Sequence, residues 1–244
     1  MIRPLGILLL FLTLAFSHAD VGEIHNDPWK VLGIPHPTNV LIIVSFISGL
    51  FVFYAIFVKT LSDRVKKIVY FFIAVPIVIG TIYLAATTVY LNLVSETGGP
   101  VHWHADYEVW GCGEKYELAD PSGFENRVGT PVLHEHNDNR IHVEGVLLKK
   151  AEASLGNYFD QVGGNLESDL LTIPTTKGLL TWKNGDKCNG QPGKWYVFVN
   201  GKLIADPENY IISPYTLVPP GDQIKLVFTD KRSDQINTQI GGPP

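Results

Sequence analysis

Two long apolar stretches without a charged side chain constrain the fold of this chain most. Residues 40–58 supply 19 such positions and residues 68–91 supply 24. About 20 apolar residues suffice for a helix to cross the hydrocarbon core of a bilayer, so each stretch predicts a spanning helix. Pro76 lies inside the second stretch and is expected to kink or tilt it. The residues after about 94 must then fold as a separate unit outside the bilayer.

The charges that flank these stretches predict which segments lie outside the cell. Loop 59–67 carries four basic residues and one acidic residue. Basic loops stay in the cytoplasm, so residues 20–39 and the chain after residue 95 are predicted to be exoplasmic. Residues 1–19 are interpreted as a secretory signal peptide or, alternatively, as an uncleaved N-terminal anchor, and both leave this sidedness unchanged. Spans without an internal charge indicate an anchor (residues 40–94) rather than a carrier.

The remaining residues predict an exported domain with an acidic surface. Residues 95–100 form a linker rich in turn-forming residues, residues 101–232 form the domain, and residues 233–244 are expected to be a disordered tail. Residues 101–244 contain 19 acidic and 13 basic residues. Nucleic acid requires clustered Lys and Arg, so we exclude it as a partner, whereas a cation suits this charge.

The chain contains two cysteines, Cys112 and Cys188, and both fall in the predicted exported domain. An even pair in an oxidising compartment is most simply one disulfide. Two free thiols or a thiolate metal ligand are the alternatives that the sequence leaves open.

Five of the eight histidines fall within the 41 residues from 102 to 142. They occur as two His-x-His pairs followed by a single histidine. Residues two apart in a strand point to the same face. Strict alternation over residues 101–110 predicts such a strand, with its apolar face inward and its histidines on the other side. A turn at residues 137–139 is expected to bring His136 and His142 close together across a hairpin.

Imidazoles on one face of three strand segments predict a transition-metal site. We expect His104, His136 and His142 at its core. The carboxylates of Asp106 and Glu144 are expected to complete the ligand shell or to orient a histidine ring. Without an obvious thiolate, Cu(II) or Zn(II) is favoured. An exposed histidine-rich face and a hydrogen-bonded polar layer under the hairpin are the alternatives. The full set of candidate ligands is His102, His104, His134, His136, His142, Glu144 and Asp106.

The second half of the domain predicts one short helix among strands. Ser154 is a candidate N-cap for a helix that ends at Gly163-Gly164. Alternating stretches at residues 179–182, 194–199 and 223–229 predict strands, and Asn200-Gly201 indicates a hairpin. The fold class is therefore α+β: two transmembrane helices followed by an exoplasmic mixed β-sheet domain with one short helix.

Two parts of the domain resemble known families. Residues 195–202 (Trp-Tyr-Val-Phe-Val-Asn-Gly-Lys) and 220–224 (Pro-Gly-Asp-Gln-Ile) are similar to the closing strands of β-grasp domains in cell-surface and cobalamin-carrier-like proteins, a likeness that covers about residues 150–230. His102-Trp103-His104-Ala105-Asp106-Tyr107 and Ile141-His142-Val143-Glu144 resemble a family of uncharacterised archaeal membrane proteins with an exported His-x-His-Ala-Asp-Phe domain, in which position 144 is often histidine. The resemblance implies a β-grasp-like fold and no particular activity.

Three functions follow from these patterns as hypotheses. The first is a membrane-anchored exported domain that binds Cu or Zn through its histidines, as a metal-delivery module or as an accessory subunit of a membrane or cell-envelope complex. The second is a β-grasp interaction module with structural histidines. The third is a small Zn hydrolase, because a metal-bound water can act as a nucleophile. The His-x-His-x-Asp start of the metallo-β-lactamase motif lacks its final histidine, since Tyr107 follows Asp106. The sequence thus favours a binding protein over an enzyme.

Overall fold

The computed structural model describes residues 27–58, 60–121, 124, 126–212 and 221–244. The predicted signal peptide, residues 1–19, lies outside the described residues. The chain divides into two compact units, residues 1–91 and residues 92–244. Each unit has its own internal packing.

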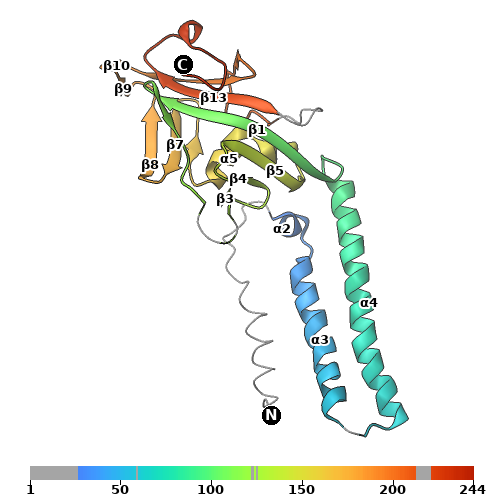
Figure 1. Cartoon of the computed structure of the whole chain (residues 1–244). Helices are drawn as coiled ribbons and strands as arrows, with labels where there is room; N and C mark the ends of the chain where they lie inside the picture. The colour runs from blue at the N-terminus through green and yellow to red at the C-terminus, as the bar shows by residue number, and fades with distance from the viewer. Residues whose placement is uncertain (1–26, 59, 122–123, 125, 213–220) are drawn as a thin grey trace. The chain divides into compact units, whose positions relative to one another are not determined.

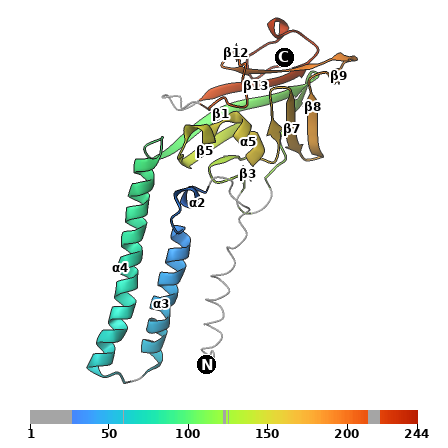
Figure 2. The ribbon, with the colours of Figure 1, turned by 180° about the vertical axis from the view of Figure 1, so that it is seen from behind.

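The first unit contains two long apolar helices that lie side by side (Figures 1 and 2). The ring of Phe51 stacks on that of Phe72 at 4.7 Å, and Ser48 Oγ donates a hydrogen bond to the Ile73 carbonyl at 3.3 Å. Both helices are long and apolar enough to cross a membrane, and few of their side chains are buried by the protein. The described part of the chain therefore has two helices that could anchor it in a bilayer. The helices of this unit are α2 (Pro28–Leu32), α3 (Pro37–Phe57) and α4 (Asp63–Val94).

The second unit is built on one large mixed β-sheet, in which β1 is the longest strand (Figure 1). β1 runs parallel to β13 on one side and antiparallel to β5 on the other. The strand order is β12-β11-β13-β1-β5-β4-β3, with β2 paired to the far end of β1. The strands are β1 (Pro100–Gly111), β2 (Glu114–Tyr116), β3 (Val128–Gly129), β4 (Leu133–Glu135), β5 (Arg140–Val146), β11 (Lys194–Val199), β12 (Lys202–Leu203) and β13 (Asp222–Thr229).

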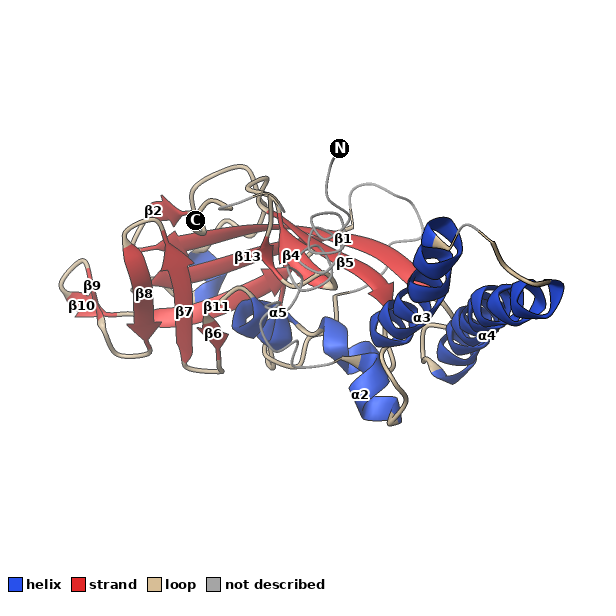
Figure 3. Ribbon diagram, turned by 90° about the horizontal axis from the view of Figure 1, so that it is seen from below, coloured by secondary structure: helices blue, strands red, loops and turns tan. Residues whose placement is uncertain are grey.

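One face of this sheet packs on the short helix α5 (Leu155–Gln161), as Figure 3 shows. Ala105, Tyr107 and Val109 alternate along β1 and are buried in the core that α5 helps to form. The ring centroid of Tyr107 lies 5.8 Å from that of Tyr158 on the helix. The predicted N-cap is confirmed, because Ser154 Oγ accepts a hydrogen bond from the α5 backbone. The intervening residues of β1, which include the histidines, therefore face away from α5.

The C-terminal segment covers part of this second face of the sheet. Lys225 on β13 is fully buried, and its ammonium donates hydrogen bonds to the carbonyls of Gln239 and Gly242, both at 2.7 Å. The backbone N–H of Gly241 donates to the Glu108 carboxylate at 3.0 Å. The sequence predicted a disordered tail over residues 233–244. The structure instead holds this segment in place, because a buried ammonium requires acceptors that the tail supplies. The segment includes the 3-10 helix η2 (Ser233–Gln235).

The predicted linker is also part of the domain. The backbone N–H of Glu96 donates to the Leu148 carbonyl at 3.1 Å, and its carboxylate accepts from the Lys150 N–H at 2.8 Å, where the 3-10 helix η1 (Lys150–Ala153) begins. These bonds join the segment before β1 to the chain that follows β5. Residues 95–100, predicted as a linker, are thus hydrogen-bonded to the sheet domain through Glu96.

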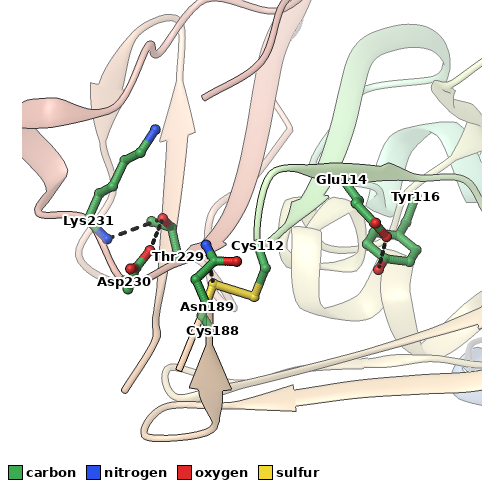
Figure 4. Close-up of a disulfide and its surroundings, with 8 residues drawn as sticks. All are labelled: Cys112, Glu114, Tyr116, Cys188, Asn189, Thr229, Asp230 and Lys231. Atoms are coloured by element: carbon green, nitrogen blue, oxygen red, sulfur yellow. Dashed lines mark hydrogen bonds between the residues drawn. A yellow bond between two sulfur atoms is a disulfide. The ribbon is translucent and has the colours of Figure 1, made fainter. Parts of the chain in front are cut away.

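Two smaller sheets complete the domain, and a disulfide connects one of them to β1. Cys112, just after β1, is bonded to Cys188 in β9, with 5.4 Å between the Cα atoms (Figure 4). The predicted disulfide is confirmed, and the described residues contain no free cysteine. One small sheet consists of β6 (Asn165–Leu166), β7 (Leu170–Thr175) and β8 (Gly178–Lys183), and the other of β9 (Lys187–Cys188) and β10 (Gln191–Pro192).

The predicted fold class, α+β with two apolar helices and a mixed sheet domain, is confirmed at this level. The predicted strands at residues 194–199 and 223–229 match β11 and β13 closely, and the Asn200-Gly201 turn joins β11 to β12. Asn200 takes a positive φ of 51°, which asparagine tolerates better than most residues.

Replacing both Cys112 and Cys188 by alanine should lower the free energy of unfolding of the sheet domain. The bond joins residues 76 positions apart, and the chain-entropy model gives a loss of about 4.5 kcal/mol as an upper figure. Denaturant titration followed by tryptophan fluorescence measures the change. Reduction of the unmodified chain is the matched control and should produce the same loss. Equal stability of the oxidised, reduced and substituted proteins would contradict the prediction.

Candidate metal centre

Three histidines from three neighbouring strands stand in one row across the second face of the sheet. His104 of β1 pairs with His142 of β5, and His142 pairs with His134 of β4. Paired residues in antiparallel strands hold their Cβ atoms about 5 Å apart. The ring centroids of His104 and His142 are 4.7 Å apart, and those of His134 and His142 are 5.3 Å apart with nearly parallel planes. The strand segments that the sequence predicted to converge do so.

His102 and His136 lie beside this row. His102 lies two residues before His104, and their Nε2 atoms are 2.8 Å apart, in hydrogen-bond contact. His136 follows the end of β4, and its Nδ1 lies 2.5 Å from the Asn126 carbonyl. A carbonyl can only accept, so Nδ1 of His136 donates the proton and its Nε2 keeps a lone pair for a metal.

The five rings form two groups of three that share His142. In each group, one ligand atom from every residue lies within 4.8 Å of the other two. Three nitrogens bound to one tetrahedral ion are about 3.3 Å apart, so side-chain rotations that move the nitrogens by about 1–2 Å would complete either group. We call the group with the exposed His102 the outer group and the group with the buried His134 the inner group. The outer group is His102, His104 and His142, and the inner group is His134, His136 and His142.

Burial keeps a histidine of the inner group in the neutral form that can bind a metal. His134 is only 3 % exposed, and its Nδ1 has no hydrogen-bond partner within the described ranges of the chain. Burial lowers the pKa of His134 to about 4, because the charged ring would lose its hydration, and the neighbouring His136 and His142 act in the same direction. The ring is therefore neutral at physiological pH, which is the form that binds a metal.

The outer group shows the same effect at lower burial. The pKa of His104 is lowered, first by burial and then by the neighbouring His142 and His102. The side chain of His102 is 64 % exposed, so the outer group is open to solvent at this residue.

Two carboxylates lie against the shared histidine, one on each ring nitrogen. Glu144 Oε1 is 3.8 Å from Nδ1 of His142 and 3.5 Å from Nε2 of His102. Asp138 Oδ2 is 3.3 Å from Nε2 of His142. Burial alone would raise the pKa of Asp138, but the hydrogen bond and charge of His142, together with backbone N–H groups, lower it. Sequence reasoning interpreted Asp138 only as a turn residue. Its position four residues before His142, across a hairpin turn, was the available signal.

The structure shows where each of the predicted ligands lies. The predicted core of His104, His136 and His142 draws on both groups, because His104 belongs to the outer group and His136 to the inner. His136 and His142 lie close together as predicted, with ring centroids 5.0 Å apart, and in the strand register it is His134 that pairs with His142. Asp106 belongs to neither group. It lies opposite Arg140 in the register and accepts a hydrogen bond from Arg140 Nε at 2.6 Å, so an ion pair uses this carboxylate.

Comparisons with protein-family models, with curated proteins and with solved structures found no match to this chain.

The lowered pKa of His134 should make the stability of the domain depend on pH. Between about pH 6.5 and pH 4 the unfolded chain binds a proton at this position and the folded chain does not. The free energy of unfolding therefore falls as the pH falls through this window, by at most about 3 kcal/mol. Denaturant titrations at pH 7 and pH 4 measure this loss, without added metal.

His134→Leu should remove this contribution, so its unfolding free energy should change less between the two pH values. His36→Leu, at the N-cap of α3 and outside the sheet domain, is the control, and the pH dependence of the sheet domain should match that of the unmodified chain. A pH dependence that is the same with and without His134 would show that its ring titrates normally.

Proposed function

We propose that this chain is a membrane-anchored, exported metal-binding protein whose clustered histidines hold a transition-metal ion. One observation carries the proposal. Five imidazoles from three adjacent segments lie in two groups with ligand atoms within 4.8 Å of one another. Three or four converging imidazoles are an ordinary ligand set for Zn or Cu.

Unsatisfied ring nitrogens favour a metal over a purely structural role. Nδ1 of His134 and Nδ1 of His142 are both buried, and no residue that the structure describes forms a hydrogen bond with either. Buried polar atoms are nearly always paired, since an unpaired one costs free energy. A hydrogen-bonded polar layer would supply these partners, and here the described residues do not. A metal ion would satisfy both atoms.

The ligand chemistry supports Cu(II) or Zn(II). Both cysteines are joined in a disulfide, so no thiolate is offered to select Cu(I). Imidazole with a neighbouring carboxylate, as in Glu144, suits both proposed ions. The disulfide also suits an oxidising compartment, in which copper is held as Cu(II).

The two apolar helices support a role at the membrane. We propose that α3 and α4 anchor the chain and that the sheet domain lies on the exoplasmic side, because the basic residues Arg64, Lys66 and Lys67 fall between the two predicted spans. In this position the domain would deliver its metal to another membrane or cell-envelope protein, or serve as an accessory subunit of such a complex.

We also propose a β-grasp relationship for the sheet domain. It is supported by the parallel pairing of β1 with β13, the first and last long strands, at the centre of the sheet. The packing of the single helix α5 on one face of that sheet supports it too. In this arrangement the histidines occupy the face that the helix leaves uncovered.

The purified full-length chain in detergent should bind Cu(II) or Zn(II), and replacing the five histidines together by alanine should abolish that binding. Equilibrium dialysis with elemental analysis gives the bound metal per chain. The matched control is His36→Ala, which removes a histidine outside both groups and should bind metal like the unmodified chain.

Failure of the unmodified chain to retain or titrate either metal would overturn the proposed function. So would equal binding by the five-histidine variant, provided that its circular dichroism spectrum shows an intact fold.

The proposed sidedness has its own test. The disulfide consumes both native cysteines, so a single added cysteine reports its location. Lys177→Cys, in the turn between β7 and β8, should react with a membrane-impermeant maleimide on intact cells. Asp63→Cys, in the basic loop, should react only after permeabilisation. The reverse pattern would place the sheet domain in the cytoplasm.

A further inference from the structure

His142 is a member of both histidine groups, and its ring has two different surroundings. Nε2 lies 3.3 Å from Asp138 Oδ2 and is in hydrogen-bond contact with it. A carboxylate accepts, so Nε2 carries the proton and donates it. Nδ1 is buried, has no hydrogen-bond partner in the described part of the chain and keeps its lone pair. The ring therefore offers a metal one nitrogen, and the carboxylate behind it fixes that tautomer.

One nitrogen cannot serve two ions at once. A neutral imidazole nitrogen has a single lone pair, so an ion in the outer group and an ion in the inner group compete for Nδ1 of His142. Two dications bound around the same atom would also repel each other strongly at such short range. Occupation of one group excludes occupation of the other.

The two groups differ in their access to water. The side chain of His102 in the outer group is 64 % exposed, while His134 in the inner group is 3 % exposed as a residue. Exposed ligands can replace the waters of a hydrated ion quickly. A buried ligand such as His134 shields the bound ion from water and from competing ligands, although His136 of the same group is not buried. The inner group is therefore suited to retention and the outer group to capture.

We propose that the two groups are successive positions for a single ion, with the outer group capturing it and the inner group retaining it. This inference rests on the proposed metal-binding function. His142 stays bound throughout, while His102 and His104 are exchanged for His134 and His136. Each exchange forms one metal–nitrogen bond as another breaks. The metal keeps its charge, and no oxidant or reductant takes part.

Glu144 lies close to histidines of both groups, between which the ion would move. Its carboxylate is 3.5 Å from Nε2 of His102 and 3.8 Å from Nδ1 of His142, and its negative charge also acts on His134. An anion that faces both groups keeps the cation electrostatically stabilised while its nitrogen ligands change. Glu144 is therefore a positioning residue for the transfer, and Asp138 is one for the ring of His142.

The test uses the full-length chain in detergent, with Zn(II) alone as the probe. Elemental analysis after gel filtration gives the number of ions per chain, stopped-flow mixing gives the association rate, and release to an excess of chelator gives the dissociation rate. The unmodified chain should bind one ion. His102→Ala combined with His104→Ala should still bind one ion, with association slowed roughly tenfold or more and dissociation little changed.

The inner pair should give the mirror result. His134→Ala combined with His136→Ala should still bind one ion at an unchanged association rate, with dissociation accelerated roughly tenfold or more, in the range of losses seen when metal ligands are disturbed. His142→Ala should bind Zn(II) most weakly of the single variants, because it removes a ligand from both groups. His36→Ala is the control for all of these measurements.

The outcomes separate this inference from the proposed function. Two ions bound to the unmodified chain would overturn the single-ion account and leave metal binding standing. One ion with equal association rates in the unmodified and outer-pair chains would remove the capture role. No bound ion in any chain would overturn the proposed function itself.

Discussion

The register of three neighbouring strands controls the arrangement of the candidate site. His104, His142 and His134 occupy directly paired positions on β1, β5 and β4. A shift of one residue in either pairing would turn one of these rings into the α5 core and an apolar residue onto the second face. The buried Ala105, Ile141 and Leu133, which alternate with the histidines, prevent that shift. The apolar core therefore fixes where the imidazoles stand.

The second face of the sheet is divided between two polar arrangements. Over β13 the C-terminal segment covers the buried Lys225 and gives its ammonium two carbonyl acceptors. Over β5 and β4 the polar groups are histidines, and two of their nitrogens have no hydrogen-bond partner among the described residues. The ion pair of Asp106 with Arg140 lies on the same face and keeps that carboxylate occupied. The polar groups over β13 thus find their partners within the chain, whereas the histidines over β5 and β4 still have nitrogens that could bind a metal.

Much of this organisation could be predicted from local patterns. Alternation predicted β1 with its two faces, the Asn-Gly turn predicted the β11–β12 hairpin, and the cysteine pair predicted the disulfide. The predictions that differ from the structure concern contacts between residues far apart in the sequence, or the exact pairing of residues on neighbouring strands. The C-terminal segment is ordered because it supplies acceptors to the buried Lys225. The sequence around Lys225 does not reveal that this lysine is buried. The division of the histidines into two groups depended on whether His134 or His136 faces His142, and the short β4 ends before His136. The contact of Asp138 with Nε2 of His142 could not be predicted either, because Asp138 lies in the turn, where no strand alternation indicates the direction of its side chain.

X-ray absorption spectroscopy of the full-length chain loaded with one equivalent of Zn(II) or Cu(II) tests the convergence of these rings most directly. The account predicts metal–nitrogen bonds near 2.0–2.1 Å, with the multiple-scattering pattern of about three imidazoles, lost when His142 and both His-x-His pairs are replaced. A shell of oxygen ligands without imidazole scattering would contradict it, because the metal would then be bound somewhere other than at the row of histidines.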